Sequence, residues 1–315
     1  MVDVTVVVPT RNRAPLLGQA LRSVAAQRDI ELEAVVVDDG STDATPAVVA
    51  GLRDARLRLV RHDRRQGVSA ARNRGIAEAG GDWVAFLVDD DLWAPDKLTR
   101  QLAAAARDDR DWAVTGAVCI DDRLQVLTGE PPLPPEAIVA DLVRYNSVPA
   151  GASNVVVRAG LLAEVGGFDP SLRHMADWDL WIRLGRAGLP ATVPRPLLAY
   201  RLHRANATMD TAFDPWEAVA EFDTIAGRYH IPADRLAVDR WIAWTSLRAG
   251  RRRAALRAYA HAARAGDLRS VVRAAIALLH PAAGRRVYYR PFLQRGQDEG
   301  WLAEARSWLH DLASG

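Results

Sequence analysis

Short apolar runs alternate with helical patterns through the first part of the chain. The runs are rich in valine and suit strands buried on both faces of a sheet; they are Val4–Val8, Leu32–Val37, Leu57–Arg61, Trp83–Val88 and Trp112–Ile120. Helices are predicted between them, beginning at Ala14, at Thr45 as an N-cap, at Gly67 and at Asp96. This alternation predicts right-handed crossovers and an α/β fold with a mainly parallel central sheet flanked by helices.

Three consecutive carboxylates, Asp89, Asp90 and Asp91, follow the fourth of these runs. Adjacent acids at the end of a buried strand repel one another and are costly to desolvate, so we expect a cation to offset that cost. Mg²⁺ or Mn²⁺ binds carboxylate and phosphate oxygens together. The stretch therefore predicts a metal–diphosphate site. A solvated acidic turn is the alternative, although the bulky LWAP that follows argues against it.

Two further polar loops follow predicted strands, at Thr10–Arg13 and Asp38–Asp43. Because the carboxyl ends of parallel strands meet at one edge of a sheet, these loops should lie beside the acid cluster. We expect a nucleotide–metal pocket where the three loops converge.

Composition narrows the classes of protein that fit. The chain has 315 residues and a net charge of +2, so no global field favours nucleic acid. Cys119 is the only cysteine, which excludes an intramolecular disulfide and a multi-cysteine metal site. We find no signal peptide and no apolar run of the ~18 residues that a membrane span needs, so a cytoplasmic location is expected. There is also no GxGxxG after a strand, no Walker A loop and no GxSxG elbow.

The middle of the chain carries a second group of acids. The proline-rich Glu130–Pro149 is predicted to be a surface loop, and His174–Gly188 has helical spacing. Asp177 and Asp179 lie in the first turn of that helix, where the helix dipole favours acids. For Asp179 we expect only this capping role. Asp177 is flanked by apolar residues, so its pKa could be raised into the range of a general base.

Helical patterns replace strand signals from Asp214 onward, and we place a domain boundary near Phe213, with a helical region over 214–315. Twelve arginines and one acid lie between Arg248 and Arg295. Solvated helix faces, an anionic membrane surface, an anionic acceptor or a partner subunit, as in a homodimer, would each suit this excess. Nucleic acid is disfavoured because no recognisable nucleic-acid-binding fold is present.

The order of the motifs resembles family 2 glycosyltransferases of the GT-A fold, which is Rossmann-like. The resemblance covers about residues 3–205 and rests on VVVPTRNR, VVVDDGSTD, GVSAARNRGI, the acid cluster with LWAP, VGGFD and ADWDLWIRL. It implies transfer of a sugar from a nucleotide-diphosphate donor with inversion at the anomeric carbon. No QxxRW-type motif is present, so a transferase that adds a single sugar is implied.

The resemblance also implies roles for residues at the donor site. Pro9, Thr10 and Asn12 would line the nucleotide pocket, Asp39 would accept a hydrogen bond from the base with support from Asp38, and Arg72 would reach the nucleotide or its phosphates. A uridine diphosphate sugar is the favoured donor, although Asp39 could accept a ring N–H from uracil, thymine or guanine.

The acid cluster is similar to the family's metal motif, which implies Mn²⁺ or Mg²⁺ as cofactor. Asp90 would be the direct ligand, Asp89 would lie nearer the ribose or sugar, and Asp91 would be a further ligand. The chain departs from the commonest form of the motif, in which an acid occupies the position of Val88. His203 resembles a histidine of the family that approaches the metal or phosphates; an ordinary loop histidine is the alternative.

Asp177 matches the second acid of the family's Glu-Asp pair, the proposed catalytic base, while Ala176 replaces the first. Inversion needs a carboxylate that takes the acceptor's proton on the face opposite the leaving group. A lipid-linked saccharide, a polysaccharide end or a small natural product would each suit as acceptor.

Two other classes of protein stay open at this point. An inactive domain could bind a nucleotide-sugar or scaffold a complex; the presence of both Asp90 and Asp177 argues against it. A nucleotidyltransferase would need a Gly-rich phosphate loop near its N-terminus, of which PTRNR supplies only part.

Overall fold

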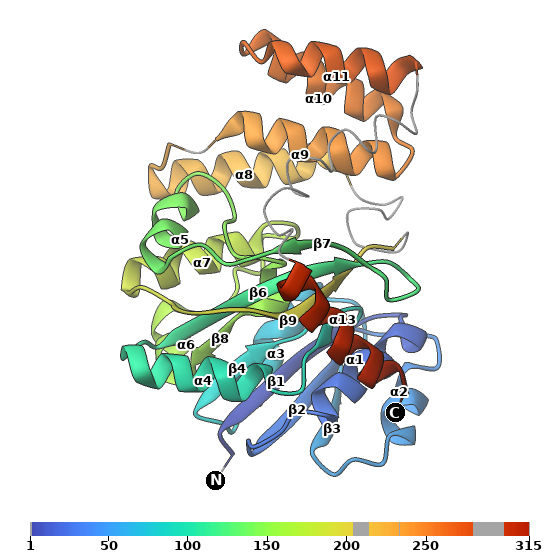
Figure 1. The fold of residues 1–315 in the computed structure, drawn as a ribbon, viewed down its shortest axis with the longest axis vertical. Coiled ribbons are helices and arrows are strands. Elements are labelled where there is room, and N and C mark those ends of the chain that lie inside the picture. Colours follow the sequence, from blue (N-terminus) through green and yellow to red (C-terminus); the bar gives the residue numbers. More distant parts are fainter. Residues whose placement is uncertain (1, 204–213, 233, 280–298, 315) are drawn as a thin grey trace.

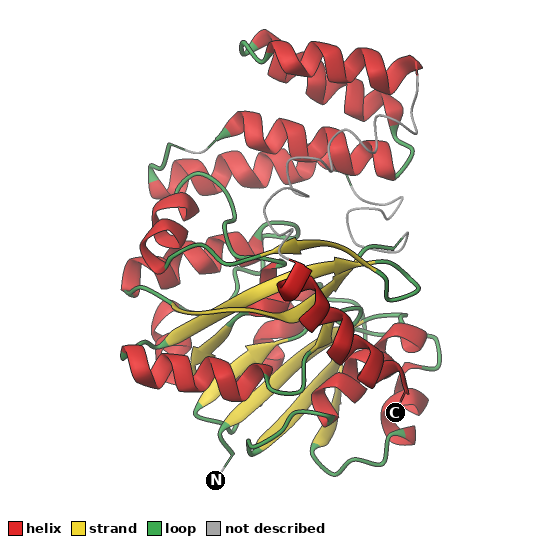
Figure 2. Cartoon of the chain, in the orientation of Figure 1, coloured by secondary structure: helices red, strands yellow, loops and turns green. Residues whose placement is uncertain are grey.

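The structure, a computed structural model, describes residues 2–203, 214–232, 234–279 and 299–314. The predicted boundary at Phe213 and the arginines between 280 and 298 lie outside these ranges. A curled central sheet has helices on both faces, and a stack of further helices extends the molecule at one end (Figures 1 and 2).

Within the described residues, nine strands form one sheet in the order β3-β2-β1-β4-β8-β6-β9-β5, with β7 paired to β6. The strands are β1 Val4–Thr10, β2 Leu32–Asp38, β3 Leu57–Arg61, β4 Trp83–Phe86, β5 Leu92–Trp93, β6 Trp112–Ile120, β7 Val126–Glu130, β8 Val156–Arg158 and β9 Ala191–Arg201. The first four strands in sheet order are parallel. The antiparallel pairs are β4 with β8, β6 with β8, β6 with β7 and β5 with β9. The predicted α/β class is confirmed, with a sheet whose second half is mixed.

Helices cover both faces of the sheet, and α8 to α11 form the stack beyond it (Figure 1). They are α1 Ala14–Ala25, α2 Thr45–Gly51, α3 Val68–Ala77, α4 Lys97–Asp108, α5 Pro135–Leu142, the 3₁₀ turn η1 Gly151–Asn154, α6 Ala159–Val165, α7 Ala176–Ala187, α8 Pro215–Tyr229, α9 Arg235–Arg248, α10 Arg252–Arg264, α11 Leu268–Leu279 and α13 Glu299–Ser314. No helix among the described residues is long and apolar enough to cross a membrane.

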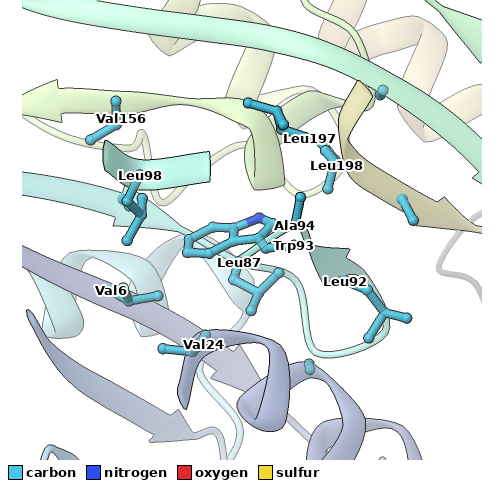
Figure 3. Packing of buried hydrophobic residues seen from close by; sticks show 14 of the residues in the cluster. Val6, Val24, Leu87, Leu92, Trp93, Ala94, Leu98, Val156, Leu197 and Leu198 are labelled. Atoms are coloured by element: carbon cyan, nitrogen blue, oxygen red, sulfur yellow. The ribbon is translucent and has the colours of Figure 1, made fainter. Parts of the chain in front are cut away.

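Two large apolar cores and one small one, formed by Val35, Val37 and Ala71, result among the described residues. One large core joins the sheet to α1, α4 and α13, and Figure 3 shows Trp93 at its centre among Val6, Leu87 and Leu98. The other large core joins the opposite face to α5, α7 and α8. Thus α13, the last described helix, returns to the sheet, where Trp308 Nε1 donates a 2.8 Å hydrogen bond to the carbonyl oxygen of Pro196.

Several predicted boundaries were wrong. The segment Glu130–Pro149 is not a continuous loop, because it contains α5, whose first turn accommodates Pro135. Strand β4 ends at Phe86 rather than Val88. Thr45 lies inside α2 rather than capping it, and its hydroxyl donates to Asp43.

Strand β9 was missed. It contains Pro194 and Pro196, which lack the backbone N–H that a strand interior needs. Its register with β6 shifts on both sides of Gly116, the stretch that Pro196 faces. The two prolines therefore do disfavour regular strand pairing, and the irregular pairing of β9 with β6 accommodates them.

Candidate active site

The first two strands end together, so their loops meet. Thr10 lies opposite Asp38 in the parallel register of β1 and β2. Beyond this point, Asn12 adopts a positive φ of 54° and its side-chain oxygen accepts the amide of Thr42 at 2.8 Å. The amide of Asn12 donates to the hydroxyl of Ser41 at 2.9 Å. The expected convergence of the two polar loops is therefore observed.

Asp39 organises the loop that leads into α3. Its carboxylate accepts the amides of Gln66 at 2.7 Å and Gly67 at 2.8 Å, and His62 Nδ1 lies 2.9 Å from Oδ1. Burial raises the pKa of Asp39, but these hydrogen bonds outweigh burial and lower it overall. A carboxylate can accept about four hydrogen bonds, so room for one more donor remains. Its neighbour Asp38 is buried and accepts the amide of Ser41 at 2.7 Å.

We expect Asp39→Ala to lower the free energy of unfolding by about 1–3 kcal/mol, because buried donors lose their acceptor. Urea titration at neutral pH measures this loss. Exposed Asp63→Ala is the control and should change stability by less than about 0.5 kcal/mol. Since the pKa is lowered on folding, the stabilisation is present above the pKa of unfolded Asp39 and is lost as pH falls through the folded pKa. An equal loss in both variants would contradict this role.

Asp89 and Asp90 lie where β1, β4 and β9 end. Asp89 accepts the hydroxyl of Thr10 at 2.7 Å, and Arg13 Nη1 donates to Asp89 at 3.1 Å and to Asp90 Oδ2 at 2.7 Å. His203 Nε2 lies 2.9 Å from the same oxygen of Asp90. Burial and the neighbouring Asp90 raise the pKa of Asp89 to about 6 against the opposing effect of Arg13. The cation that the acids were expected to need is thus partly supplied by Arg13.

Asp91 faces away from this cluster into the protein. It is fully buried, and its carboxylate accepts the hydroxyl of Ser153 at 2.5 Å and the amide of Arg201 at 3.1 Å. Burial and Asp90 raise its pKa well above the usual range. These contacts favour a role in holding η1 and β9 against the acid loop.

The pair of Asp90 and His203 fits part of a metal site. A 2.9 Å hydrogen bond joins His203 Nε2 and Asp90 Oδ2, so one imidazole and one carboxylate, both possible ligands of a divalent cation, lie side by side. No group of three or more His, Cys, Asp or Glu side chains within the described ranges forms a complete metal cage. Mg²⁺ usually takes one or two protein ligands and completes its shell with water and substrate phosphates, so a partial set is what such an ion requires.

Asp177 and Arg72 form a second charged group. The partly buried Asp177 accepts a 3.2 Å hydrogen bond from Asn146 Nδ2. Burial raises its pKa, while the nearby Arg72 opposes the increase. Arg72, on α3, is buried with its guanidinium 4.9 Å from the centre of the Phe168 ring, and its Nε has no hydrogen-bond partner among the described residues. Arg72 therefore lies next to Asp177, and its buried Nε–H is available to donate a hydrogen bond to a ligand.

The turn η1 links the two charged groups. Ser153 binds Asp91, and a Cβ at Gly151 would come within 3.0 Å of Asp177 Oδ2. Gly151 also has a positive φ of 61°, so no other residue would suit both its backbone and this close approach. Because these two residues are only two positions apart, η1 contacts both the acid loop, through Asp91, and Asp177.

Helix α8 supports the start of α7 from outside the sheet. Glu221, 8% exposed, accepts the amides of Arg173 at 2.7 Å, His174 at 2.8 Å and Met175 at 2.9 Å. Asp179 lies in the first turn of α7, as predicted. Its role extends beyond the helix end, because its buried carboxylate binds Arg183, Arg228 and Tyr229 and so joins α7 to α8.

Arg13, Ser153, Asn146 and Glu221 were not identified from the sequence as parts of the site. Arg13 stands in the PTRNR motif, but arginine is so abundant in this chain that a single one carries little signal. The other three lie far from the acids in sequence, and no pattern of spacing connects them.

Comparison with known proteins identifies the family. The model of "Glycosyl transferase family 2" matches residues 5–148. The succinoglycan biosynthesis protein ExoO of Rhizobium meliloti is 48% identical over 103 residues, which are 33% of this chain and 30% of ExoO. An uncharacterized glycosyltransferase of Nostoc sp. is 32% identical over 218 residues, 66% of this chain and 67% of that protein. A putative teichuronic acid biosynthesis glycosyltransferase of Bacillus subtilis, TuaG, is 29% identical over 206 residues, 63% and 79% of the two chains.

Solved structures share the fold. Residues 1–349 of S. aureus TarS, in complex with UDP-GlcNAc, superpose with a TM-score of 0.60 at 17% identity and cover 93% of this chain and 90% of TarS 1–349. The mannosyltransferase PcManGT of Pyrobaculum calidifontis, in complex with GDP-Man and Mn²⁺, gives a TM-score of 0.51 at 24% identity and covers 99% and 86%. With its α/β sheet and its polar loops gathered where the strands end, the chain belongs to glycosyl transferase family 2 and is a glycosyltransferase of the GT-A fold.

Proposed function

We propose that this protein transfers a single sugar from a nucleotide-diphosphate donor to a hydroxyl acceptor, with inversion and with a divalent cation. The observation that carries the proposal is the meeting of Asp90 and His203 beyond the ends of β4 and β9, with η1 close by: Ser153 of η1 binds the adjacent Asp91, and Gly151 of η1 approaches the partly buried Asp177. Asp90 and His203 then serve the leaving diphosphate, and Asp177 serves the attacking hydroxyl.

Donor recognition is assigned to the loops after β1 and β2. Asp39 has one acceptor position left for a ring N–H of the base, Asp38 supports its loop, and Pro9, Thr10 and Asn12 line the pocket. TarS has been solved with UDP-GlcNAc and PcManGT with GDP-Man, which supports a nucleotide-sugar as donor. We favour a uridine diphosphate sugar.

Asp90 and His203 would hold Mn²⁺ or Mg²⁺, which when bound supplies Lewis-acid stabilisation of the leaving diphosphate. The buried Nε of Arg72 would bind a phosphate or sugar oxygen of the donor. Asp89 positions Thr10 and Arg13, and Asp91 holds η1 in place. Asp177 takes the proton of the acceptor hydroxyl as the new glycosidic bond forms.

The acceptor is proposed to be a saccharide or a lipid-linked saccharide. ExoO and TuaG are named for the biosynthesis of succinoglycan and teichuronic acid, which supports a glycan over a small natural product. We also propose a catalytic unit over 1–213 and a helical region over 214–315 that serves the acceptor side, with α8 bracing the start of α7 through Glu221.

The identity of the released product separates this proposal from the alternatives. Incubation of the protein with UDP-glucose, UDP-GlcNAc or GDP-mannose, Mn²⁺ and a lipid or glycan extract should release free nucleoside diphosphate. Release of sugar 1-phosphate from the same donors would assign nucleotidyl transfer, because the nucleoside monophosphate would then move to the acceptor. Tight donor binding without any turnover across acceptors would assign an inactive, donor-binding protein.

The activity should depend on pH through Asp177. Only the deprotonated carboxylate accepts a proton, and burial raises its pKa, so kcat should fall as pH falls through a midpoint above the ordinary carboxyl value. The hydrogen bond from Asn146 stabilises the charged form and lowers that pKa. Asn146→Ala is therefore expected to move the acidic limb of the pH–rate profile to higher pH. A limb that moves to lower pH, or stays in place, would argue against Asp177 as the titrating base.

A further inference from the structure

Helices α10 and α11 form the outermost layer at one end of the long axis of the molecule (Figure 1). Helix α10 packs against α9, and α11 packs against α10 as its main partner among the described elements. The outer side of α11 is therefore not covered by the part of the chain that the structure describes.

An aliphatic stripe lies on this helix. Leu268 is 76% exposed, Val271 52% and Val272 60%, and they are three of the five large apolar side chains exposed within the described ranges. The other two, Val68 and Leu127, are isolated and less exposed. Exposed Ala275 continues the i, i+3, i+4, i+7 spacing that places residues on one helical face. We call Leu268, Val271, Val272 and Ala275 the α11 stripe.

Uncompensated positive charge lies on the same pair of helices as the α11 stripe. Arg252, Arg253, Arg264 and Arg269 are exposed, and none has an acidic partner among the described residues. Asp267 is the one acid of α10, α11 and their connection, and it is buried and bound by Arg240. The hairpin thus combines an exposed aliphatic face with free guanidinium groups.

We propose that the α10–α11 hairpin is a contact surface for an anionic lipid bilayer. Aliphatic side chains that enter the boundary between headgroups and acyl chains, flanked by arginines that pair with lipid phosphates, are the features of a helix that lies in the membrane interface. A second copy of this chain would bring the same positive charge against itself. A nucleic acid would use the arginines but leave the α11 stripe in water.

The hairpin lies at the end of the molecule toward which the first strands run, beyond α8 and α9 (Figure 1). The first strands run from the end where the N-terminus lies toward the end that α8–α11 occupy, so the loops at their carboxyl ends open toward the helical stack (Figure 1). Contact with a bilayer through the hairpin would bring the site toward the headgroups, where a lipid-linked saccharide presents its sugar. This step rests on the proposed function, whereas membrane contact itself does not.

The test is co-sedimentation of the full chain with vesicles of phosphatidylglycerol and phosphatidylcholine, compared with phosphatidylcholine alone. We expect binding to the anionic vesicles that weakens as salt rises. Leu268→Ser should weaken it, while Leu127→Ser, a matched change at an exposed leucine on β7, should not. Leu268→Ser/Val271→Ser/Val272→Ser should lower the partition coefficient about tenfold or more. Arg252→Glu/Arg253→Glu/Arg264→Glu/Arg269→Glu should abolish the preference for anionic lipid.

Several outcomes would overturn the proposal. These are equal binding to both vesicle types, unchanged binding of the triple serine variant with native far-UV circular dichroism, or dimerisation that the triple variant abolishes without any vesicle binding by the wild type. Salt-sensitive binding to DNA or RNA in place of vesicles would do the same. Metal-dependent nucleotide binding, measured separately, reports on the proposed function and is unaffected by these variants.

Discussion

Asp177→Asn is expected to lower kcat by about 10²–10⁴-fold, because an amide cannot take the proton of the acceptor hydroxyl. The substitution keeps the shape of the side chain and can still accept the 3.2 Å hydrogen bond from Asn146. Donor binding should therefore survive, and the loss should appear in kcat rather than in the dissociation constant of the nucleoside diphosphate. Single-turnover measurement of nucleoside diphosphate release separates the two.

The exposed Asp311→Asn on α13 is the matched control and should keep full activity. A contrasting variant is offered by Arg72, which lies beside Asp177 and whose buried Nε has no partner among the described residues. Arg72→Lys should mainly weaken donor binding, since a lysine does not reproduce a guanidinium fork. Equal kcat in wild type and Asp177→Asn would show that Asp177 takes no part in the chemistry.

The second large effect is expected for Asp90→Asn. This change replaces a charged metal ligand by a neutral one, and a metal ion contributes several kcal/mol to stabilising charge in the transition state. At about 1.36 kcal/mol for each tenfold change in rate, we expect a loss of about 10²–10³-fold in kcat/KM and a higher Mn²⁺ concentration for half-maximal rate. Metal titrations at saturating donor measure both.

Asp91→Asn is the contrasting variant. An asparagine can still accept the amide of Arg201 and exchange a hydrogen bond with Ser153, and the pKa of Asp91 is already raised well above the usual range. We therefore expect the metal concentration for half-maximal rate to change little. A larger change in Asp91→Asn than in Asp90→Asn would reverse the proposed division of roles between the two acids.

Local sequence signals predicted the parallel half of the fold well. Strand β1 is buried at every position, and the valine runs of β1 and β2 have no other stable location than the centre of a sheet. Their polar ends, Thr10 and Asp38, meet because parallel strands align their carboxyl ends. The convergence of the two polar loops, Thr10–Arg13 and Asp38–Asp43, followed from the same reasoning.

The second half of the site could not be predicted, because long-range contacts decide it. Ser153 reaches Asp91 across 62 positions and Glu221 reaches Arg173 across 48, and neither leaves a periodic pattern. Helix α5 was hidden by the prolines around it, and β9 by its own prolines. Lys97, the one lysine, was expected on an ordinary helix but is fully buried with its ammonium 4.1 Å from the Trp93 ring.

The most direct measurement is a thermal-shift screen of the wild-type chain with UDP, GDP and dTDP, each in Mn²⁺, Mg²⁺ or EDTA. A ligand at about 100 times its dissociation constant stabilises the folded state by about 2.7 kcal/mol. A metal-dependent nucleotide-sugar transferase should be stabilised by one of these nucleotides, UDP before the others, with Mn²⁺ or Mg²⁺ and much less with EDTA. If no nucleotide stabilises the protein in the presence of either metal, the donor site proposed at the ends of β1, β2 and β4 is wrong.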